Sequence, residues 1–326
     1  MVTRPAAVES VPCPLCGGER RYPLLTAGDR LRSEDPTRYT VVRCARCGLA
    51  YTDPRPTAED IGRFYPQSYG GLERDGLLAR AEEAYRCRQQ REVVAWLADL
   101  RPRRGRLLDV GCGAGDLLAV LRADGWDAEG VEPAAAAADL ARRRHGLRVL
   151  TGRFEEAQVT GLFDVVTLAG VLEHLHDPLS ALRRARALLR PQGLVAILFL
   201  PRLDSDEARR FGPRWLALDL PRHLTHFDDA GFSRMAQSAG LRIERTEPYS
   251  RRHSAAQLVG SLVPGLQKHR FYLREDQTAP KTRAAGLAPL ARRAAFLTLT
   301  TAARPWCRWE AARGRGGLCS YFLEVT

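Results

Sequence analysis

The strongest candidate for chemistry in this chain is a glycine-rich turn that follows an apolar segment. Residues 106–115 are Arg-Leu-Leu-Asp-Val-Gly-Cys-Gly-Ala-Gly, and a helix-like segment, 116–124, follows directly. A strand, a glycine turn and a helix in this order let the backbone approach a polar ligand at the helix N-terminus. A turn that binds a dinucleotide pyrophosphate has the pattern G-x-G-x-x-G, which requires glycine where this chain has Asp116. The pattern present is G-x-G-x-G, formed by Gly111, Gly113 and Gly115.

An acidic residue follows at the position where a ribose is commonly held. Glu132 ends a second short apolar segment, 128–131, and lies 21 residues after Gly111. A carboxylate at the end of the second strand of a βαβ unit accepts hydrogen bonds from ribose hydroxyls. Together the turn and Glu132 indicate a nucleoside-containing cofactor. An adenine-dinucleotide domain, or an α/β core that binds no cofactor, is the alternative.

These residues resemble motif I of the class I S-adenosylmethionine-dependent methyltransferases. Segment 163–174, which ends in Leu-Glu-His, resembles the F-D-x-V-x-x-x-x-V-L-E-H segment of members that act on small molecules. The resemblance covers about residues 85–250. It implies that S-adenosylmethionine is bound by Asp109, Gly111, Gly113, Gly115, Glu132, Phe154, Glu155 and Gly170.

Two matched cysteine pairs near the N-terminus indicate a metal site. Cys13 and Cys16 form one C-x-x-C pair, Cys44 and Cys47 form the other, and a glycine follows each pair. With about 27 residues between the pairs, four sulfurs can surround Zn²⁺ tetrahedrally. Four protein ligands leave no open position, so the metal is expected to fold a zinc ribbon and take no part in chemistry. Loss of the metal is expected to unfold only the first ~55 residues.

A loop that is both polar and aromatic, 215–227, is the candidate site for the methyl acceptor. It resembles the W-x-x-L-D-x-P-R-H-L-x-H-F segment found with zinc-ribbon methyltransferases of surface-polysaccharide and secondary-metabolite clusters. Histidine suits removal of a proton from an acceptor hydroxyl, because its ordinary pKa is about 6.5. His223 is the preferred base, with His226 and Asp219 as supports. His174, at the carboxyl edge of the expected sheet, is the other candidate, either as a base or as a residue that fixes its loop.

The apolar pattern predicts the elements that position these residues. It indicates an α/β, Rossmann-like class I methyltransferase fold with a seven-stranded, mostly parallel sheet and an antiparallel last strand. The expected strands are 106–110, 127–131, 147–150, 163–168, 193–200, 241–248 and 319–325, and the expected helices are 77–100, 115–124, 134–145, 178–190 and 228–239. Tyr65 and Tyr69 precede the first strand and are candidates for a lid over the cofactor, or for packing.

Five regions follow from this pattern. They are a zinc ribbon (11–54), a linker and helical lid (55–100), an S-adenosylmethionine-binding core (101–250), a helical insertion (251–313) and the final strand of the core (314–326). The insertion carries arginines beside Leu287, Leu290, Phe296, Leu297 and Leu299, followed by Trp306 and Trp309. It is expected to cap the sheet or to form a dimer contact. The alternative is peripheral contact with an anionic membrane through 287–309.

Composition narrows the possible partners. The chain has 326 residues, of which 45% are hydrophobic and 27% charged, as in soluble globular proteins. It shows no secretory signal and no apolar run of the ~18 residues that cross a bilayer, so the cytoplasm is the expected compartment. The net charge of +12 comes almost entirely from arginines spread along the chain. Nucleic acid is therefore not the expected partner, and a solvated basic surface explains the charge.

The predicted function is transfer of a methyl group from S-adenosylmethionine to a small molecule, either a sugar or glycan precursor or a secondary metabolite. Oxygen, nitrogen and carbon acceptors all remain open. The alternative enzyme is an RNA methyltransferase that uses the zinc ribbon and the basic surface. Such enzymes tend to have a histidine after the second cysteine pair, where this chain has Gly-Leu-Ala-Tyr, and their fourth strand is often followed by N-P-P-Y or D-P-P-Y rather than Leu-Glu-His. A binding scaffold without activity is the non-enzymatic alternative. Such a scaffold would not need Glu132 to accept hydrogen bonds from a ribose.

Overall fold

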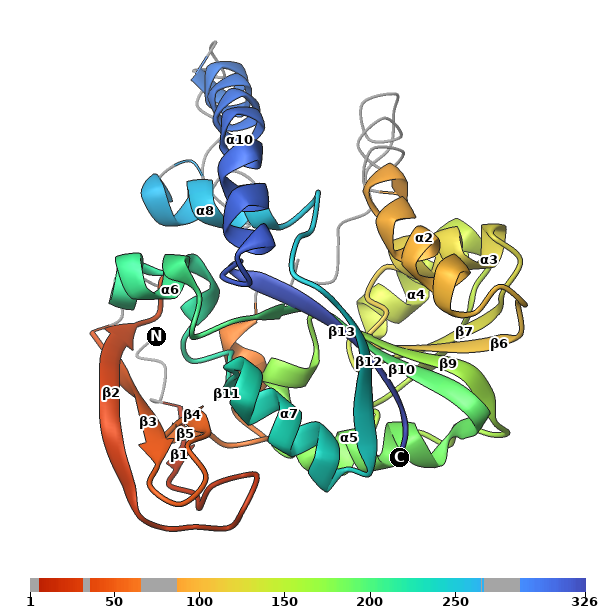
Figure 1. The fold of residues 1–326 in the computed structure, drawn as a ribbon, viewed down its shortest axis with the longest axis horizontal. Helices are drawn as coiled ribbons and strands as arrows, with labels where there is room; N and C mark the ends of the chain where they lie inside the picture. The colour runs from red at the N-terminus through yellow and green to blue at the C-terminus, as the bar shows by residue number, and fades with distance from the viewer. Residues whose placement is uncertain (1–5, 32–35, 66–86, 265, 267–287) are drawn as a thin grey trace.

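The computed structural model describes residues 6–31, 36–65, 87–264, 266 and 288–326, and its centre is a seven-stranded sheet (Figure 1). The strands are β6 (Arg106–Val110), β7 (Asp127–Glu132), β8 (Arg148–Thr151), β9 (Phe163–Ala169), β10 (Leu189–Pro201), β12 (Leu241–Glu247) and β13 (Leu318–Val325). Their order is β12-β13-β10-β9-β6-β7-β8. β13 runs antiparallel to both of its neighbours, and the other neighbouring pairs are parallel. The predicted fold class is confirmed.

Helices cover both faces of this sheet (Figure 1). α2 (Arg91–Leu100), α3 (Asp116–Ala123) and α4 (Ala135–His145) lie on one face, and α5 (Pro178–Ala187) and α7 (Asp229–Ser238) lie on the other. Successive side chains of a strand point to opposite faces, so one strand contributes to two cores. In β6, Leu107 packs in the cluster that contains Leu118 of α3, whereas Leu108 packs in the cluster that contains Phe232 of α7.

A second sheet is formed near the N-terminus and includes a strand from far along the chain. β2 (Arg21–Gly28), β3 (Arg38–Cys44) and β4 (Ala50–Thr52) pair antiparallel, and β11 (Thr225–His226) pairs with β4. Two shorter strands, β1 (Val8–Glu9) and β5 (Arg55–Pro56), pair with each other. Cys13 and Tyr51 belong to the same buried cluster as Phe232 of α7. The N-terminal residues therefore share a hydrophobic core with the main sheet.

Short helical turns connect these parts around the carboxyl edge of the sheet. They are η1 (Ile61–Phe64), η2 (Leu172–His174), η3 (Gly212–Arg214) and η4 (Leu216–Leu218), together with α6 (Asp206–Phe211). The segment from α6 to β11 contains the predicted acceptor loop. Within the described part of the insertion, α8 (Ser254–Leu262) packs against α10 (Ala288–Ala312), which projects away from the sheet (Figure 1).

Two predicted boundaries are wrong. The helix predicted over 178–190 ends at Ala187, and β10 begins at Leu189 rather than at 193. Residues 191 and 192 fall between the predicted helix and the predicted strand, but Pro191-Gln192-Gly193 lies inside β10, where the register with β9 shifts. In the helix predicted over 77–100, Gln90 forms a turn between helical residues 87–89 and α2.

Some predicted residues cannot be compared with the structure. Residues 77–86, Tyr69 and Leu287 lie outside the described residues, as does the side chain of Leu290. Where the structure is described, no helix combines the length and apolarity needed to span a bilayer.

Candidate functional site

The glycine turn connects β6 to α3 and leaves part of its backbone open. Gly111, Gly113 and Gly115 have φ angles of 69°, 54° and 83°, a left-handed region that favours glycine. A Cβ built on Gly111 would lie 2.6 Å from the Val171 side chain, whereas a Cβ built on Gly113 would meet nothing within 4 Å. The turn is therefore closed on the side of Val171 and open at Gly113, where a ligand can approach the backbone.

Two carboxyl groups lie beside the turn. Glu132, at the end of β7, accepts hydrogen bonds from the amides of Gly113 at 2.8 Å and Ala134 at 2.9 Å. Each of its oxygens keeps a lone pair for a further donor, such as a ribose hydroxyl. Asp109 is fully buried and accepts a hydrogen bond from the Thr167 hydroxyl at 2.6 Å. Burial raises the pKa of Asp109 to about 7, so its charge at neutral pH depends on what binds next to it.

The other residues that the resemblance assigns to the cofactor are more dispersed. Phe154 is buried, with the Arg184 guanidinium 5.1 Å from the centre of its ring. Glu155 is 3.8 Å from the Arg153 guanidinium. Gly170, at the end of β9, has a φ of 63°, and a Cβ built there would lie 3.9 Å from a carboxylate oxygen of Glu173. Gly170 thus lies beside Glu173. The cofactor-binding role of Phe154 and Glu155 stays a prediction.

Three side chains from two distant segments converge near the glycine turn. Glu173 and His174 lie in η2 after β9, and His223 lies in the predicted acceptor loop. Their nearest ligand atoms all lie within 4.8 Å of one another, and the two imidazole rings are 4.5 Å apart in an edge-to-face arrangement. Because Val171 borders Gly111 and directly precedes η2, this cluster adjoins the turn.

The hydrogen bonds of the two histidines fix which ring nitrogen can act as a base. Nδ1 of His223 lies 2.8 Å from the Ala217 carbonyl oxygen, and Nδ1 of His174 lies 3.1 Å from that of Arg222. A carbonyl only accepts, so each Nδ1 carries the proton and each Nε2 has a free lone pair. Burial lowers the pKa of His174, and it lowers the pKa of His223 well below 6.5. Both imidazoles are therefore neutral at pH 7, ready to accept a proton at Nε2.

Glu173 adds a proton donor to this pair. Its side chain is buried, and among the described residues its Oε2 has no hydrogen-bond partner. Burial raises the pKa of Glu173 to about 8, so the carboxyl is mostly protonated at neutral pH. The hydroxyl of Tyr65, a predicted lid residue, lies 3.0 Å from Nδ1 of His174. One carboxyl and two imidazoles are also a donor set that can hold a divalent metal ion.

The acceptor loop is anchored by one arginine. Arg222 is completely buried and donates to Asp219 at 2.7 and 3.1 Å and to Asp29 at 2.9 and 3.0 Å. It also donates to the Phe64 carbonyl oxygen at 3.2 Å. Burial alone would raise the pKa of Asp219, but the Arg222 guanidinium holds that pKa well below its usual range. Asp219 is therefore a carboxylate, 4.0 Å from Nε2 of His223.

His226, the second predicted support, faces the N-terminal sheet. Its Nε2 lies 3.1 Å from the Thr52 hydroxyl, which itself donates to the His223 carbonyl oxygen at 2.8 Å. Burial lowers the pKa of His226 to about 4, so the ring is neutral. The structure thus brings His174, His223 and Asp219 together and places His226 in the contact between β11 and β4.

Two residues of this arrangement were missed by sequence reasoning. Asp29 and Thr52 both belong to the N-terminal region, and Asp29 is 193 residues from Arg222. Neither lies in a recognisable motif. A signal was nevertheless present, because an arginine in a mostly apolar loop is rarely buried without an acidic partner.

The four N-terminal cysteines also converge. The sulfurs of Cys13 and Cys47 are 3.4 Å apart, those of Cys16 and Cys44 are 3.6 Å apart, and all four lie within 4.8 Å. Four thiolates that hold Zn²⁺ at 2.3 Å are about 3.8 Å from one another. A Cβ built on Gly18 would lie only 3.3 Å from one sulfur and 3.4 Å from another, so glycine leaves room for the cluster. The donor set and its spacing fit a tetrahedral metal site.

Comparison with protein families and curated proteins agrees with this geometry. A family model described as a methyltransferase domain matches residues 80–246. A ubiquinone biosynthesis O-methyltransferase of Xanthomonas axonopodis pv. citri (strain 306) is 31% identical over 160 residues, which are 45% of this chain and 66% of that protein. The corresponding enzyme of Haemophilus ducreyi (strain 35000HP / ATCC 700724) is 32% identical over 135 residues, 38% of this chain and 57% of that protein. The chain therefore spans less than two thirds of the length of these relatives.

Solved structures are also similar over part of the chain. The CcbJ methyltransferase from Streptomyces caelestis is similar with a TM-score of 0.42 and 19% identity, over 50% of this chain and 83% of that one. CalS10, an amino pentose methyltransferase from Micromonospora echinaspora, is similar with a TM-score of 0.40 and 21% identity, over 55% of this chain and 94% of that one.

Proposed function

Because this chain belongs to the methyltransferase-domain family, we propose that it transfers a methyl group from S-adenosylmethionine to a small-molecule acceptor. The observation that carries the proposal is the contact between the glycine turn and the histidine cluster. Gly111 adjoins Val171, which directly precedes η2, and the amide of Leu224 donates to the Glu173 carbonyl oxygen at 2.8 Å. A cofactor at the turn and an acceptor at the loop would therefore be neighbours.

S-adenosylmethionine, when bound, supplies a methyl group activated on a sulfonium. Glu132 would hold the ribose hydroxyls, and the open backbone at Gly113 would admit the rest of the nucleoside. Asp109, Gly115, Phe154, Glu155 and Gly170 complete the proposed cofactor-binding set. What the chain itself must do is align the acceptor, exclude water and remove a proton.

We propose His223 as the base. Its Nδ1 proton is directed to Ala217, so Nε2 can take a proton from an acceptor hydroxyl, and the Asp219 carboxylate at 4.0 Å would stabilise the imidazolium that forms. His174, whose ring lies 4.5 Å from that of His223, would orient the acceptor. A neutral base favours a hydroxyl acceptor, and the names of the relatives, O-methyltransferases, support an oxygen acceptor for this chain as well.

We also propose that Cys13, Cys16, Cys44 and Cys47 bind a structural Zn²⁺ ion, because four thiolates leave no position for substrate. Reduced thiolates of this kind persist in the cytoplasm, which we propose as the compartment. The division of the chain at residues 54, 100, 250 and 313 stays a prediction.

Mass spectrometry tests the main proposal. The protein is incubated with S-adenosylmethionine that carries an isotopically labelled methyl group and with a panel of phenols, sugar nucleotides and amino sugars. The proposal is supported if the wild type forms a labelled product from a hydroxyl compound and the variant Glu132→Ala does not. Labelled RNA instead of a small molecule would contradict it, and absence of S-adenosylmethionine binding by calorimetry would favour a scaffold.

A further inference from the structure

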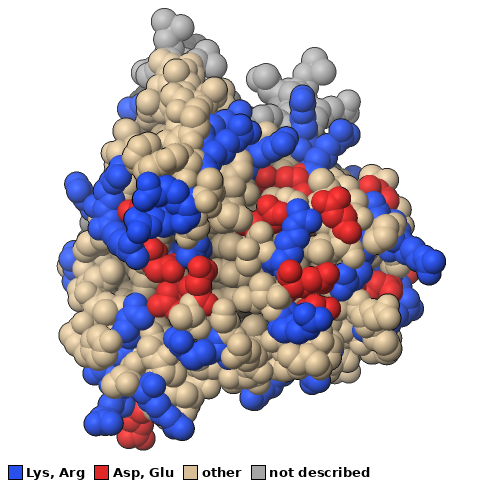
Figure 2. All heavy atoms as spheres, in the orientation of Figure 1, with Lys and Arg blue, Asp and Glu red and all other residues tan. Residues whose placement is uncertain are grey.

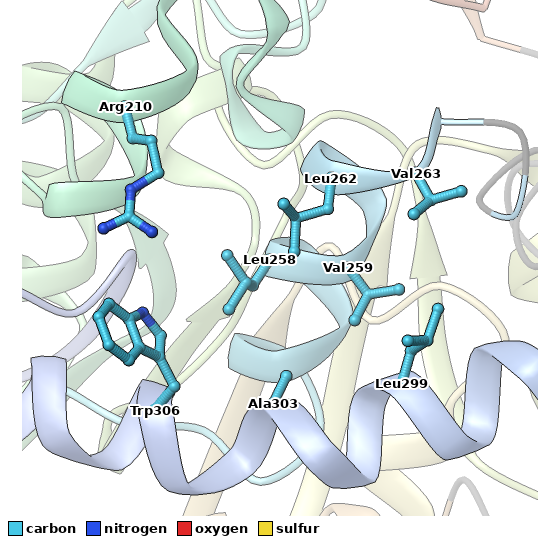
Figure 3. Close-up of a pocket in the computed structure, with 8 residues that line it drawn as sticks. All are labelled: Arg210, Leu258, Val259, Leu262, Val263, Leu299, Ala303 and Trp306. Carbon is cyan, nitrogen blue, oxygen red and sulfur yellow. The ribbon is translucent and has the colours of Figure 1, made fainter.

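An apolar groove lies between α8 and α10, away from the glycine turn (Figure 3). Its volume is about 330 Å³. Leu258 and Leu262 line it from α8, Leu299 and Trp306 line it from α10, and Arg210 of α6 lies at one end, with its guanidinium 5.3 Å from the centre of the Trp306 ring. Among the residues that line the groove, only Arg210 is charged.

The surface around this groove is also apolar and exposed. Leu262 exposes 57% of its surface, Leu297 exposes 54% and Trp309 exposes 46%. The rings of Trp306 and Trp309 are 4.9 Å apart on the same side of α10. Apolar side chains grouped in this way on a projecting helix mark a surface that meets a partner or a membrane.

The charge of α10 helps to decide between a protein partner and a membrane. Residues 288–309 contain four arginines and no aspartate or glutamate, and Glu310, which follows them, is buried. Figure 2 shows basic side chains, which among the described residues are all arginines, around the base of α10 below its tan, projecting part, with acidic side chains further below. A second copy of this chain would bring the same positive charge to the contact, with a net charge of +12 on each copy. An anionic partner would complement it.

The lining of the groove suits a lipid, because it is apolar except for Arg210 at one end. A segment of a single hydrocarbon chain would match this apolar lining, and its head group would then lie near Arg210. Trp is enriched at the boundary between acyl chains and head groups, and arginine is attracted to the surface of anionic lipids.

From these observations we propose that α8 and α10 form a docking surface for an anionic phospholipid bilayer. The helices lie on the bilayer, with the apolar groove accepting part of one acyl chain and the arginines contacting the head groups. This inference is independent of the proposed methyl transfer, because it concerns a different surface.

Vesicle co-sedimentation of the full chain tests this proposal. We expect binding to vesicles of phosphatidylcholine mixed with phosphatidylglycerol, and little binding to phosphatidylcholine alone. Arg292→Glu should weaken binding about tenfold, because each basic residue near an anionic surface contributes about 1 kcal/mol to binding. Leu297→Ser should also weaken binding about tenfold, because binding increases with the apolar area buried in the bilayer. The matched controls are Leu162→Ser and Arg103→Glu, an exposed leucine and an exposed arginine outside α8 and α10, which should bind like the wild type.

Three outcomes would overturn the proposal. The first is equal binding to the two kinds of vesicle, and the second is unchanged binding by both α10 variants. The third is a dimer in light scattering that Leu297→Ser dissociates, since a second copy would then cover the surface. If the variants unfold, tryptophan quenching by brominated lipid in the wild type decides the matter, because Trp306 and Trp309 are exposed whereas Trp126 and Trp215 are buried. The fifth tryptophan, Trp96, is partly buried and packs against Phe199 and Phe322 of the main sheet, outside α8 and α10. Lack of quenching contradicts the proposal.

Discussion

The guanidinium of Arg222 donates to both carboxylate oxygens of Asp29, at 3.0 and 2.9 Å, and at most 1% of either side chain is exposed. Asp29 follows β2, and Arg222 lies in the acceptor loop just before β11. This ion pair and the pairing of β4 with β11 connect the N-terminal sheet to the loop that carries His223. The N-terminal region is therefore part of the support of the candidate site.

Replacement of Asp29 should destabilise the protein. Among the described residues, Asp29→Asn leaves the buried Arg222 with Asp219 as its one charged partner, so we expect the free energy of unfolding in urea to fall by about 3 kcal/mol. The control is Asp127→Asn, which removes an ion pair with Arg148 at the surface and should cost less than about 1 kcal/mol. Equal effects of the two variants would show that the pair does not anchor the loop.

Loss of the four-cysteine site should reach further than the first ~55 residues, contrary to the expectation from sequence. Because β11 pairs with β4, the variant Cys13→Ser should increase amide hydrogen exchange at 225–226 as well as in β2–β4. Exchange in β6, at the centre of the main sheet, should change little. If 225–226 stays protected while β3 exchanges freely, the two sheets are not coupled in this way. Cys87→Ser, outside the cluster, is the control.

The role of Glu132 can be separated from that of its neighbours on the same strand. Glu132→Ala removes a charged hydrogen-bond acceptor and should weaken S-adenosylmethionine binding tenfold to a hundredfold, which corresponds to about 1.5–3 kcal/mol. Isothermal titration calorimetry measures this change. Glu129→Gln, on the same strand but paired with Arg106, should bind like the wild type. An unchanged affinity for Glu132→Ala would remove this residue from the cofactor site.

The proposed base makes a prediction about pH. Burial lowers the pKa of His223 well below 6.5, so Nε2 stays unprotonated, and the base active, as pH falls to 6.5. The acidic limb of the kcat profile should therefore lie below pH 6.5. His223→Ala should lower kcat about a hundredfold, within the usual range for a general base, without changing the affinity for S-adenosylmethionine. His176→Ala, which removes a histidine bonded to the Pro56 carbonyl oxygen, is the control. An acidic limb that survives in His223→Ala would transfer the role to His174.

A buried carboxyl far from the glycine turn should control how stability varies with pH. Glu207 accepts from Gln257 at 2.8 Å, and its carboxyl lies within 4.8 Å of ligand atoms of Cys307 and Glu310. Burial raises the pKa of Glu207 from 4.5 to about 7. Its contribution to stability is thus complete below pH 4.5 and is lost as pH rises through about 7.

The variant Glu207→Gln tests this dependence. It keeps an acceptor for Gln257 but cannot ionise, so its loss of stability between pH 4.5 and 7 should be smaller than that of the wild type, by on the order of 3 kcal/mol. Urea unfolding at several pH values measures the difference. Parallel curves for the two proteins would mean that Glu207 does not titrate in this range.

Local patterns were sufficient to predict the main sheet. β6 is bounded as predicted, and most other strands and helices of the core differ by one or two residues, because glycines and polar residues mark their ends. The boundary between α5 and β10 was predicted wrongly. Pro191-Gln192-Gly193 has the composition of a turn, but pairing with β9 continues on both sides of it, so the segment became an irregularity inside the strand.

Long-range contacts could not be predicted in the same way. The sequence predicts His174 and His223 as two separate candidates and does not predict that they cluster. His174 bonds to the carbonyl oxygen of Arg222, which lies 48 residues further along the chain. The pairing of β4 with β11 and the ion pair of Asp29 with Arg222 depend on tertiary packing, which leaves no periodic pattern in one sequence.

The position of β13 inside the sheet, between two strands that precede it in the chain, has a consequence for biosynthesis. This strand lies between β10 and β12, although both of these precede α8 and α10 along the chain. While a ribosome is still translating the insertion, β10 has an unpaired backbone edge along its own apolar run, Leu194–Leu200. A nascent chain that stalls in this interval would present that edge to chaperones or to other nascent chains, so slow codons within 251–313 should lower the soluble yield.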